Sequence, residues 1–212
     1  KVDEIALLSA GDVGGIAFDT TLGTLVGVAG GKAVSFVGGN WVPLSPIADR
    51  VGNELAPLLK YFDAGIGAIQ GFKAADEINA VMTAAEMSPA WKAGSMIAEV
   101  TLEPGTRVKM VISERQYQTL FGEKPEYGGF ATFDDVPNQA FARNELAITS
   151  EMKSNTSYVI EVEITQPFNA QIGIVGPQEL ASGGASQLHF IIPPVQKMNV
   201  LKFIGGSEKA LP

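Results

Sequence analysis

The feature that most constrains this chain is a change in character close to residue 90. Fourteen of its 24 glycines fall at or before Gly94, in a segment otherwise rich in alanine and small apolar residues. Beyond Glu99, short runs alternate between polar and apolar side chains, which is the period of β-strands. We therefore expect an α+β chain. Residues 1–90 should form a Gly/Ala-rich helical segment, and residues 91–212 a compact, mostly antiparallel β-rich domain with a few helices.

The first segment carries apolar residues at helical spacing. A helical hairpin is expected over residues 5–38, because its small residues permit close helix packing, and further helices are expected over residues 47–62 and 64–85. The longest uncharged run, residues 20–31, is shorter than the roughly 20 apolar residues that a membrane-spanning helix needs. The alternative interpretation is a segment that helps the protein cross a membrane, which would restrict membrane contact to delivery.

The second segment predicts several strands separated by turn signals. They are expected at residues 100–104, 107–112, 130–133, 158–165, 171–175, 187–192 and 200–204. A short helix is expected at residues 113–120, where Ser113 and Gln116 have the spacing of a capping box. Another is expected at residues 136–146, where Pro137 suits a first helical turn.

Composition excludes several classes of function. The formal net charge of −8 argues against a broad nucleic-acid surface, because such surfaces need many Lys and Arg to replace counterions. The absence of cysteine excludes disulfides and thiolate chemistry, and the single histidine, His189, excludes a metal site built from several imidazoles. The sequence lacks a complete P-loop, GxGxxG or GxSxG motif. No metal is expected.

Because the chain opens at Lys1 without a signal-peptide pattern, we expect a piece of a larger protein.

Two segments carry candidate ligand-binding residues. Arg107 follows a Pro-Gly turn at the start of a strand, where a guanidinium could hold a phosphate bidentately. Gly129 follows another glycine and precedes Phe130, Thr132 and Phe133, so that a ligand could approach the backbone and stack on an aromatic ring. The alternative interpretations are a solvent-facing strand residue and a loop that enters a buried strand.

A third segment adds candidate catalytic residues. The turn at Gly183 and Gly184 leads into a strand on which Gln187 and His189 share a face. Two adjacent polar side chains at the mouth of a strand suit a site. The alternative is a hairpin with a polar outer face.

These segments, in this order, resemble the C-terminal toxin domains of bacterial polymorphic and contact-dependent systems. Among such domains they are most similar to the ADP-ribosyltransferase-like or NAD-glycohydrolase group. The resemblance covers residues 91–212 and is carried by four phrases, LEPGTRV at 102–108, GGFATFD at 128–134, ARNELAI at 142–148 and the Gly-Gly-x-x-Gln turn at 183–187.

The resemblance implies a substrate and roles for individual residues. NAD would be the substrate, Arg107 would bind its diphosphate, and Thr132 and Phe133 would shape the nicotinamide pocket beside Gly129 and Phe130. Gln187 would contact the nicotinamide ribose, and Arg143 joins the NAD-binding set. Transferases of this group usually carry Glu where Gln187 stands, and this departure favours NAD hydrolysis over transfer.

The resemblance also implies partners and a location. A cognate immunity protein is expected, together with a macromolecular acceptor if the enzyme is a transferase. The domain would be secreted or delivered into a target cell as the C-terminal part of a larger protein.

Two functions of other classes remain open. A metal-independent RNase toxin could use His189 as general base, with Lys109, Arg143 or Thr132 on the scissile phosphate. A non-enzymatic adhesion or assembly module of a large secreted protein would use the Gly-Gly turns only as hairpins.

Overall fold

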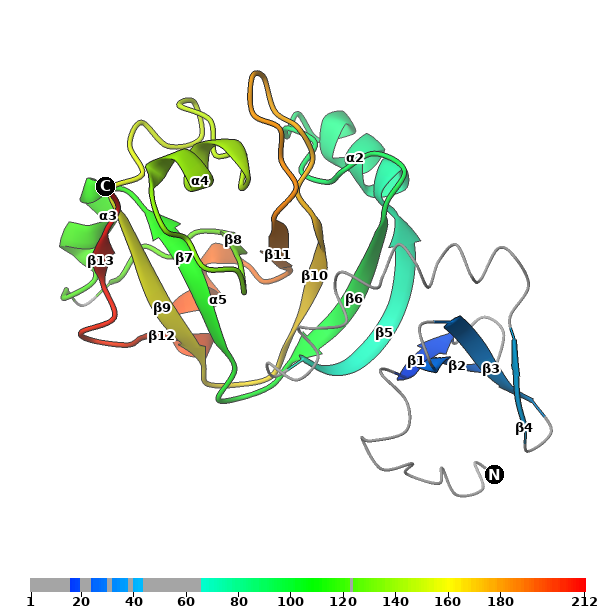
Figure 1. Ribbon diagram of the computed structural model, residues 1–212. Coiled ribbons are helices and arrows are strands. Elements are labelled where there is room, and N and C mark those ends of the chain that lie inside the picture. The colour runs from blue at the N-terminus through cyan, green and yellow to red at the C-terminus, as the bar shows by residue number, and fades with distance from the viewer. Residues whose placement is uncertain (1–15, 20–23, 30–31, 38–39, 44–65, 123) are drawn as a thin grey trace. The chain divides into compact units, whose positions relative to one another are not determined.

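The computed structural model describes residues 16–19, 24–29, 32–37, 40–43, 66–122 and 124–212 (Figure 1). The chain divides into two compact units, Lys1–Phe62 and Asp63–Pro212. The expected helix at residues 47–62 lies outside the described residues.

The described part of the first unit is a four-stranded antiparallel meander. Its strands pair in chain order: β1 (Ile16–Asp19), β2 (Thr24–Ala29), β3 (Lys32–Val37) and β4 (Asn40–Pro43). We expected a helical hairpin here, and the described residues are in strands instead. The sequence explains the difference, because Thr24, Val26 and Val28 are β-branched residues at alternate positions before Gly30-Gly31, a dipeptide typical of hairpin connections. After it, the strand-favouring residues Val34 and Phe36 are again two apart.

The second unit is built on two antiparallel sheets. The larger has the order β5 (Ile66–Ala74), β6 (Met96–Leu102), β10 (Phe168–Ile174), β11 (Ser186–Phe190), β8 (Phe130–Ala131). In the smaller, β9 (Tyr158–Ile164) pairs with β7 (Arg107–Ile112), β12 (Leu201–Phe203) and β13 (Lys209–Ala210). Lys109 and Thr132 exchange two backbone hydrogen bonds of 2.8 Å, so β7 and the chain after β8 connect the two sheets.

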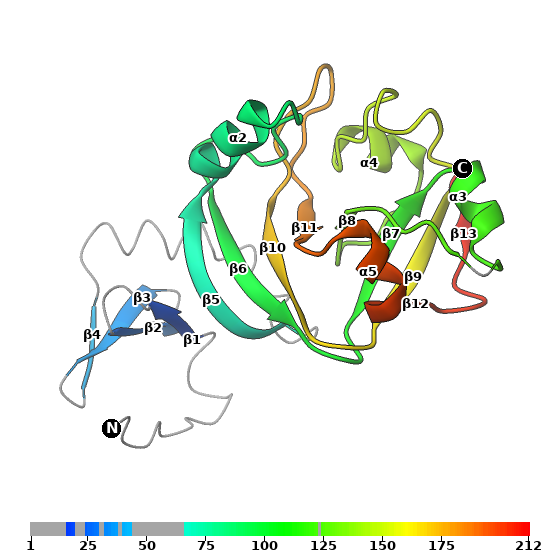
Figure 2. The same cartoon turned by 180° about the vertical axis from the view of Figure 1, so that it is seen from behind.

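Four described helices complete this unit: α2 (Ala75–Ala84), α3 (Glu114–Thr119), α4 (Gln139–Asn144) and α5 (Pro194–Val200). Figures 1 and 2 show the sheets diverging from the β9–β10 connection, with α2 and α4 at the opposite end. The capping box expected at α3 is present, since the Ser113 hydroxyl accepts from the Gln116 amide and the Gln116 side chain accepts from the Ser113 amide.

The prediction of a helix over residues 64–85 is correct only for its second half. Residues 66–74 form β5, and only the second half of the segment is helical, as α2. The register between β5 and β6 shifts between Ile66 and Ile69 and again between Ile69 and Gly71. These irregularities interrupt the two-residue alternation of a strand, and they leave apolar residues at spacings that imitate a helix. Since β5 belongs to the same sheet as β6, the folded unit also begins well before the boundary expected at residue 91.

The other strands of the β-rich domain lie close to their expected places. β7, β9, β10, β11 and β12 fall within or next to the predicted ranges. Their inward side chains form the core, which includes the fully buried residues Val108, Met110, Ile112, Ile160, Val162, Ile164, Ile172 and Leu188. β8 and α4 are shorter than expected.

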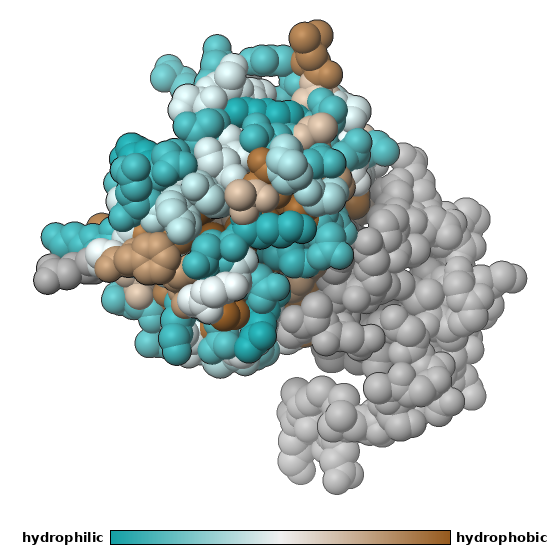
Figure 3. Space-filling view, turned by 60° about the vertical axis from the view of Figure 1, so that its left-hand side comes forward, coloured by the Kyte–Doolittle hydropathy of each residue, from teal (hydrophilic) through white to brown (hydrophobic). Residues whose placement is uncertain are grey.

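The described surface is mainly hydrophilic on the face shown in Figure 3, where apolar residues gather in separate patches. This agrees with the scatter of the large exposed apolar residues over different elements, such as Phe121, Leu180 and Val195. Within the described ranges, every helix is too short or too polar to cross a membrane.

Candidate functional site

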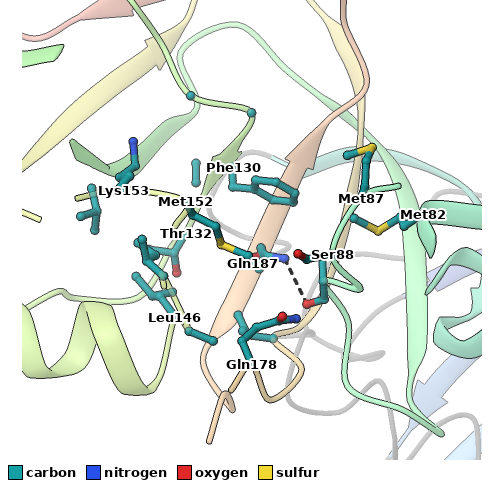
Figure 4. A pocket seen from close by; sticks show the side chains of 18 of the residues that line it. Met82, Met87, Ser88, Phe130, Thr132, Leu146, Met152, Lys153, Gln178 and Gln187 are labelled. Carbon is teal, nitrogen blue, oxygen red and sulfur yellow. Dashed lines mark hydrogen bonds between the residues drawn. The ribbon is translucent and has the colours of Figure 1, made fainter. Parts of the chain in front are cut away.

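The second unit contains a pocket of about 450 Å³ (Figure 4). Five parts of the chain meet there: the end of α2 with its connection to β6, strand β7, the segment 128–132, the segment that follows α4, and the β10–β11 hairpin. The lining residues are Met82, Met87, Ser88, Ala90, Lys109, Val111, Gly128, Gly129, Phe130, Ala131, Thr132, Leu146, Ala147, Ile148, Met152, Lys153, Val175, Gln178 and Gln187. A pocket of this size, mostly apolar with a few convergent polar groups, is typical of a small-molecule site.

The structure brings part of the predicted site together. Gly129, Phe130, Thr132 and Gln187 line this pocket, although they come from β11 and from a segment more than fifty residues earlier in the chain. The predicted residues Arg107, Phe133, Arg143 and His189 do not line it.

Phe130 provides a flat surface in the pocket. Its ring stacks on the His189 ring at a centroid separation of 4.7 Å and an interplanar angle of 20°. His189 therefore covers one face of Phe130, which is still 36% exposed and lines the pocket. The remaining surface of the ring is suited to stacking on a planar ligand.

His189 lies behind this aromatic wall rather than in the pocket. Burial, with a smaller contribution from Lys197, lowers the pKa of its imidazole, so the ring is neutral at pH 7. Its Nδ1 atom is buried without a hydrogen-bond partner. In the structure His189 makes a supporting contact with Phe130. The catalytic role expected from the sequence stays a prediction.

Gln187 is a buried polar side chain that lines the pocket. It is 8% exposed, and its Nε2 donates to the Ala90 carbonyl at 3.4 Å (Figure 4). The predicted glycine turn delivers it there. Gly183 has a φ of 66°, and its amide donates to the Asn144 carbonyl at 2.9 Å, so the turn is attached to the end of α4.

Thr132 has a structural hydroxyl. Its Oγ1 lies 3.1 Å from the Ser186 Oγ and accepts from the Asp134 amide at 3.0 Å. The Asp134 carboxylate in turn accepts from the Ser186 amide at 2.7 Å. This network ties the chain after β8 to the start of β11 and fixes the position of Gln187, the next residue along.

Two lysines line the pocket, and they differ in their partners. Lys109 Nζ pairs with the carboxylate of Asp135, and that hydrogen bond and charge lower the pKa of Asp135. Lys153 Nζ donates to Gln116 Oε1. Burial, together with the charge of Arg115, lowers the pKa of Lys153 to about 8.

Arg107 and Arg143 have other contacts. The Arg107 Nε lies 3.8 Å from Glu163 Oε2 across the β7–β9 pair, and its side chain is 61% exposed. Lys109, two residues further along the same strand face, occupies the position at the pocket. Arg143 donates to three backbone carbonyls, those of Ile148, Lys153 and Ser154, at 2.8, 2.9 and 3.3 Å.

The sequence did not indicate the other side of the pocket. Lys153 and the methionines Met82, Met87 and Met152 belong to no recognisable motif, and each is placed by tertiary packing alone. The one sequence signal for this side of the pocket was the run at residues 142–148, whose C-terminal half lines the pocket. Across the described ranges, His, Asp and Glu side chains form no group of three or more that could hold a metal ion.

Comparison with solved structures finds several that resemble this chain. Tne2, solved in complex with Tni2, is 35% identical in sequence with a TM-score of 0.53, and the alignment covers 58% of this chain and 98% of that chain. Two other structures align less well. Rhs1-CT in complex with its cognate immunity protein RhsI1 is 14% identical, with a TM-score of 0.36 over 54% of this chain and 81% of that one. Tse6 in complex with Tsi6 is 16% identical, with a TM-score of 0.34 over 51% and 71%. No family model and no curated protein matches the sequence.

Proposed function

Because the chain belongs to the same family as Tne2 and carries a bacterial toxin effector domain, we propose that it depletes NAD by hydrolysing the bond between nicotinamide and ribose. The pocket in the second unit is the proposed active site. NAD is its substrate.

The pocket has a cationic side and an apolar side, and this arrangement supports the proposal. In Figure 4, Lys153 lies at one side of the pocket, Met82 and Met87 lie at the other, and Phe130 and Gln187 lie between them. A dinucleotide suits such a pocket, because its diphosphate is anionic and the faces of its flat rings can pack on apolar and aromatic side chains. Methionine side chains adapt to such rings, and Phe130 can stack on one.

The observation that carries the proposal is the convergence of Phe130 and Gln187. The stacking surface and a buried amide, from two different strands, line one pocket. A nicotinamide stacked on Phe130 would bring its ribose towards Gln187. The Gln187 Oε1 atom has no hydrogen-bond partner among the described residues, so it can accept from a ribose hydroxyl.

The proposed reaction needs positioning more than acid or base strength. The bond between ribose C1′ and the nicotinamide nitrogen breaks, and its electron pair stays on the nitrogen, which loses its positive charge. Water adds to the cationic C1′ and releases a proton to solvent. The protein contributes by holding the nicotinamide and adenine rings of NAD at separate places in the pocket. It also orients the ribose through the neutral Gln187 amide. The apolar wall of the pocket limits access to C1′.

Expression in bacteria separates this proposal from the alternatives. Induction of the full chain should stop growth and lower cellular NAD within minutes, while tRNA and rRNA stay intact. A Gln187→Ala chain should be tolerated at equal abundance. RNA cleavage at constant NAD would instead support the RNase alternative, and harmless expression of the wild-type chain would support a non-enzymatic module.

An immunity protein is the proposed partner. Tne2 is described in complex with Tni2, and such a partner would protect the producing cell by occupying the pocket. Coexpression should then restore both growth and NAD.

A further inference from the structure

We propose that Lys153 binds the diphosphate of the substrate, and that Arg143 positions Lys153. This inference rests on the proposed function, since it assigns the anion-binding end of the same pocket.

Lys153 is a pocket cation without a counter-ion. Its ammonium donates to the neutral Gln116 Oε1, and no carboxylate in the described part of the chain pairs with it. An ammonium has three donors. The structure gives one of them a partner, so two remain for a ligand. The other pocket lysine, Lys109, already pairs with Asp135.

The surroundings of Lys153 increase its demand for an anion. Arg115 of α3 contributes electrostatic repulsion, although it pairs with Glu126. Glu151, on the same segment as Lys153, is exposed. A partly buried cation without an opposite charge is costly, and a bound diphosphate would remove that cost.

Arg143 fixes the segment that carries Lys153. Its guanidinium donates to the carbonyls of Ile148, Lys153 and Ser154, which places both ends of the segment on one rigid group. Ile148, Met152 and Lys153 of this segment line the pocket. Arg143 therefore acts on the substrate through Lys153. It belongs to the ARNELAI run at 142–148, whose last three residues line the pocket.

Binding of ADP, which carries a diphosphate and cannot be hydrolysed at a nicotinamide bond, tests the assignment directly. By calorimetry at pH 7, Lys153→Met should weaken ADP binding roughly 10- to 100-fold, the range expected for loss of a hydrogen bond to a charged group. The matched control is Lys202→Met, which removes an exposed lysine of β12 outside the pocket. Equal ADP affinity of the wild-type and Lys153→Met chains would overturn the assignment.

The pH dependence of catalysis gives a second readout. Because the pKa of Lys153 is about 8, its charge is present below that pH and is lost above it. The kcat/KM for NAD should therefore fall as pH rises through about 8, mainly through KM. Lys153→Arg, which stays charged, should abolish this fall. A fall that persists unchanged in Lys153→Arg would contradict the assignment.

Arg143→Lys tests the positioning role. It keeps the charge but loses the three-way contact, so Lys153 should become more hydrated and the fall in kcat/KM should move above pH 8, with a higher KM and little change in kcat. A fall that stays at pH 8 would show that Arg143 does not position Lys153.

If ADP binding depends on Lys153 while the wild-type chain releases no nicotinamide, the anion site stands and the proposed hydrolysis fails. If NAD is hydrolysed and Lys153→Met leaves ADP binding and KM unchanged, the hydrolysis stands and this inference fails.

Discussion

Gln187 and His189 share a strand face, but they have different positions relative to the pocket. Gln187 lines it, whereas His189 lies behind Phe130 with its ring neutral at pH 7. The sequence could place both on one face of β11, because strand alternation fixes that. It could not show that an aromatic ring from β8 separates His189 from the cavity, since this depends on pairing with residues far away in the sequence.

Removing the Gln187 amide should impair catalysis more than folding. Gln187→Ala is expected to lower kcat for NAD roughly 100- to 1,000-fold, the range seen when a preorganised polar contact is lost. Gln171→Ala is the matched control, because Gln171 is a similarly buried glutamine on the adjacent strand and does not line the pocket. Steady-state kinetics and thermal unfolding of both variants check the prediction. Equal losses of kcat would remove Gln187 from the proposed mechanism.

His189 should act through packing. His189→Phe keeps a ring against Phe130 and should retain most NAD hydrolysis, whereas His189→Ala should reduce it severalfold by releasing Phe130. Complete loss of activity in His189→Phe would instead indicate proton transfer.

His189 should also make stability depend on pH. Its folded-state pKa lies below the ordinary value of 6.5, so the unfolded chain binds a proton more readily. The contribution of His189 to stability is thus present above pH 6.5 and is lost as pH falls below it. Between pH 7 and 5, the unfolding free energy of the wild-type chain should fall more than that of His189→Phe. Parallel curves for the two proteins would contradict the proposed burial of a neutral imidazole.

At the scale of elements, local signals predicted some parts well. The alternation of Arg107, Val108, Lys109 and Met110 gave the bounds of β7, and the Ser113/Gln116 spacing gave the start of α3. Both signals are contained within a few residues. β5 was missed because its bulged pairing with β6 breaks the alternation, and the positions of Lys153 and the pocket methionines depend on how distant elements pack.

The Gly183 turn offers a test of how elements deliver the site. A Cβ at Gly183 would lie 2.5 Å from the Val175 carbonyl oxygen, and its φ of 66° already disfavours other residues. Gly183→Ala should therefore destabilise the protein by more than the roughly 1–3 kcal/mol of backbone strain alone. Gly94→Ala, also at positive φ but with open space around the added Cβ, should cost only the strain. Chemical denaturation compares them, and equal losses would show that the clash at Gly183 is relieved elsewhere.

At the scale of the whole molecule, the pocket depends on the second unit as a whole. Its lining runs from Met82 of α2 to Gln187 of β11, and the two sheets meet beside it at Lys109 and Thr132. The acidic chain presents two lysines at this pocket, so a net charge of −8 is compatible with the proposed binding of an anionic dinucleotide there.

Incubation of the purified full chain with NAD tests the central claim most directly. Chromatography should show nicotinamide and ADP-ribose appearing in equal amounts, without any added protein acceptor, and the rate should collapse in Gln187→Ala but not in Gln171→Ala. NAD that stays intact with the folded wild-type chain, with or without candidate acceptors, would contradict the account.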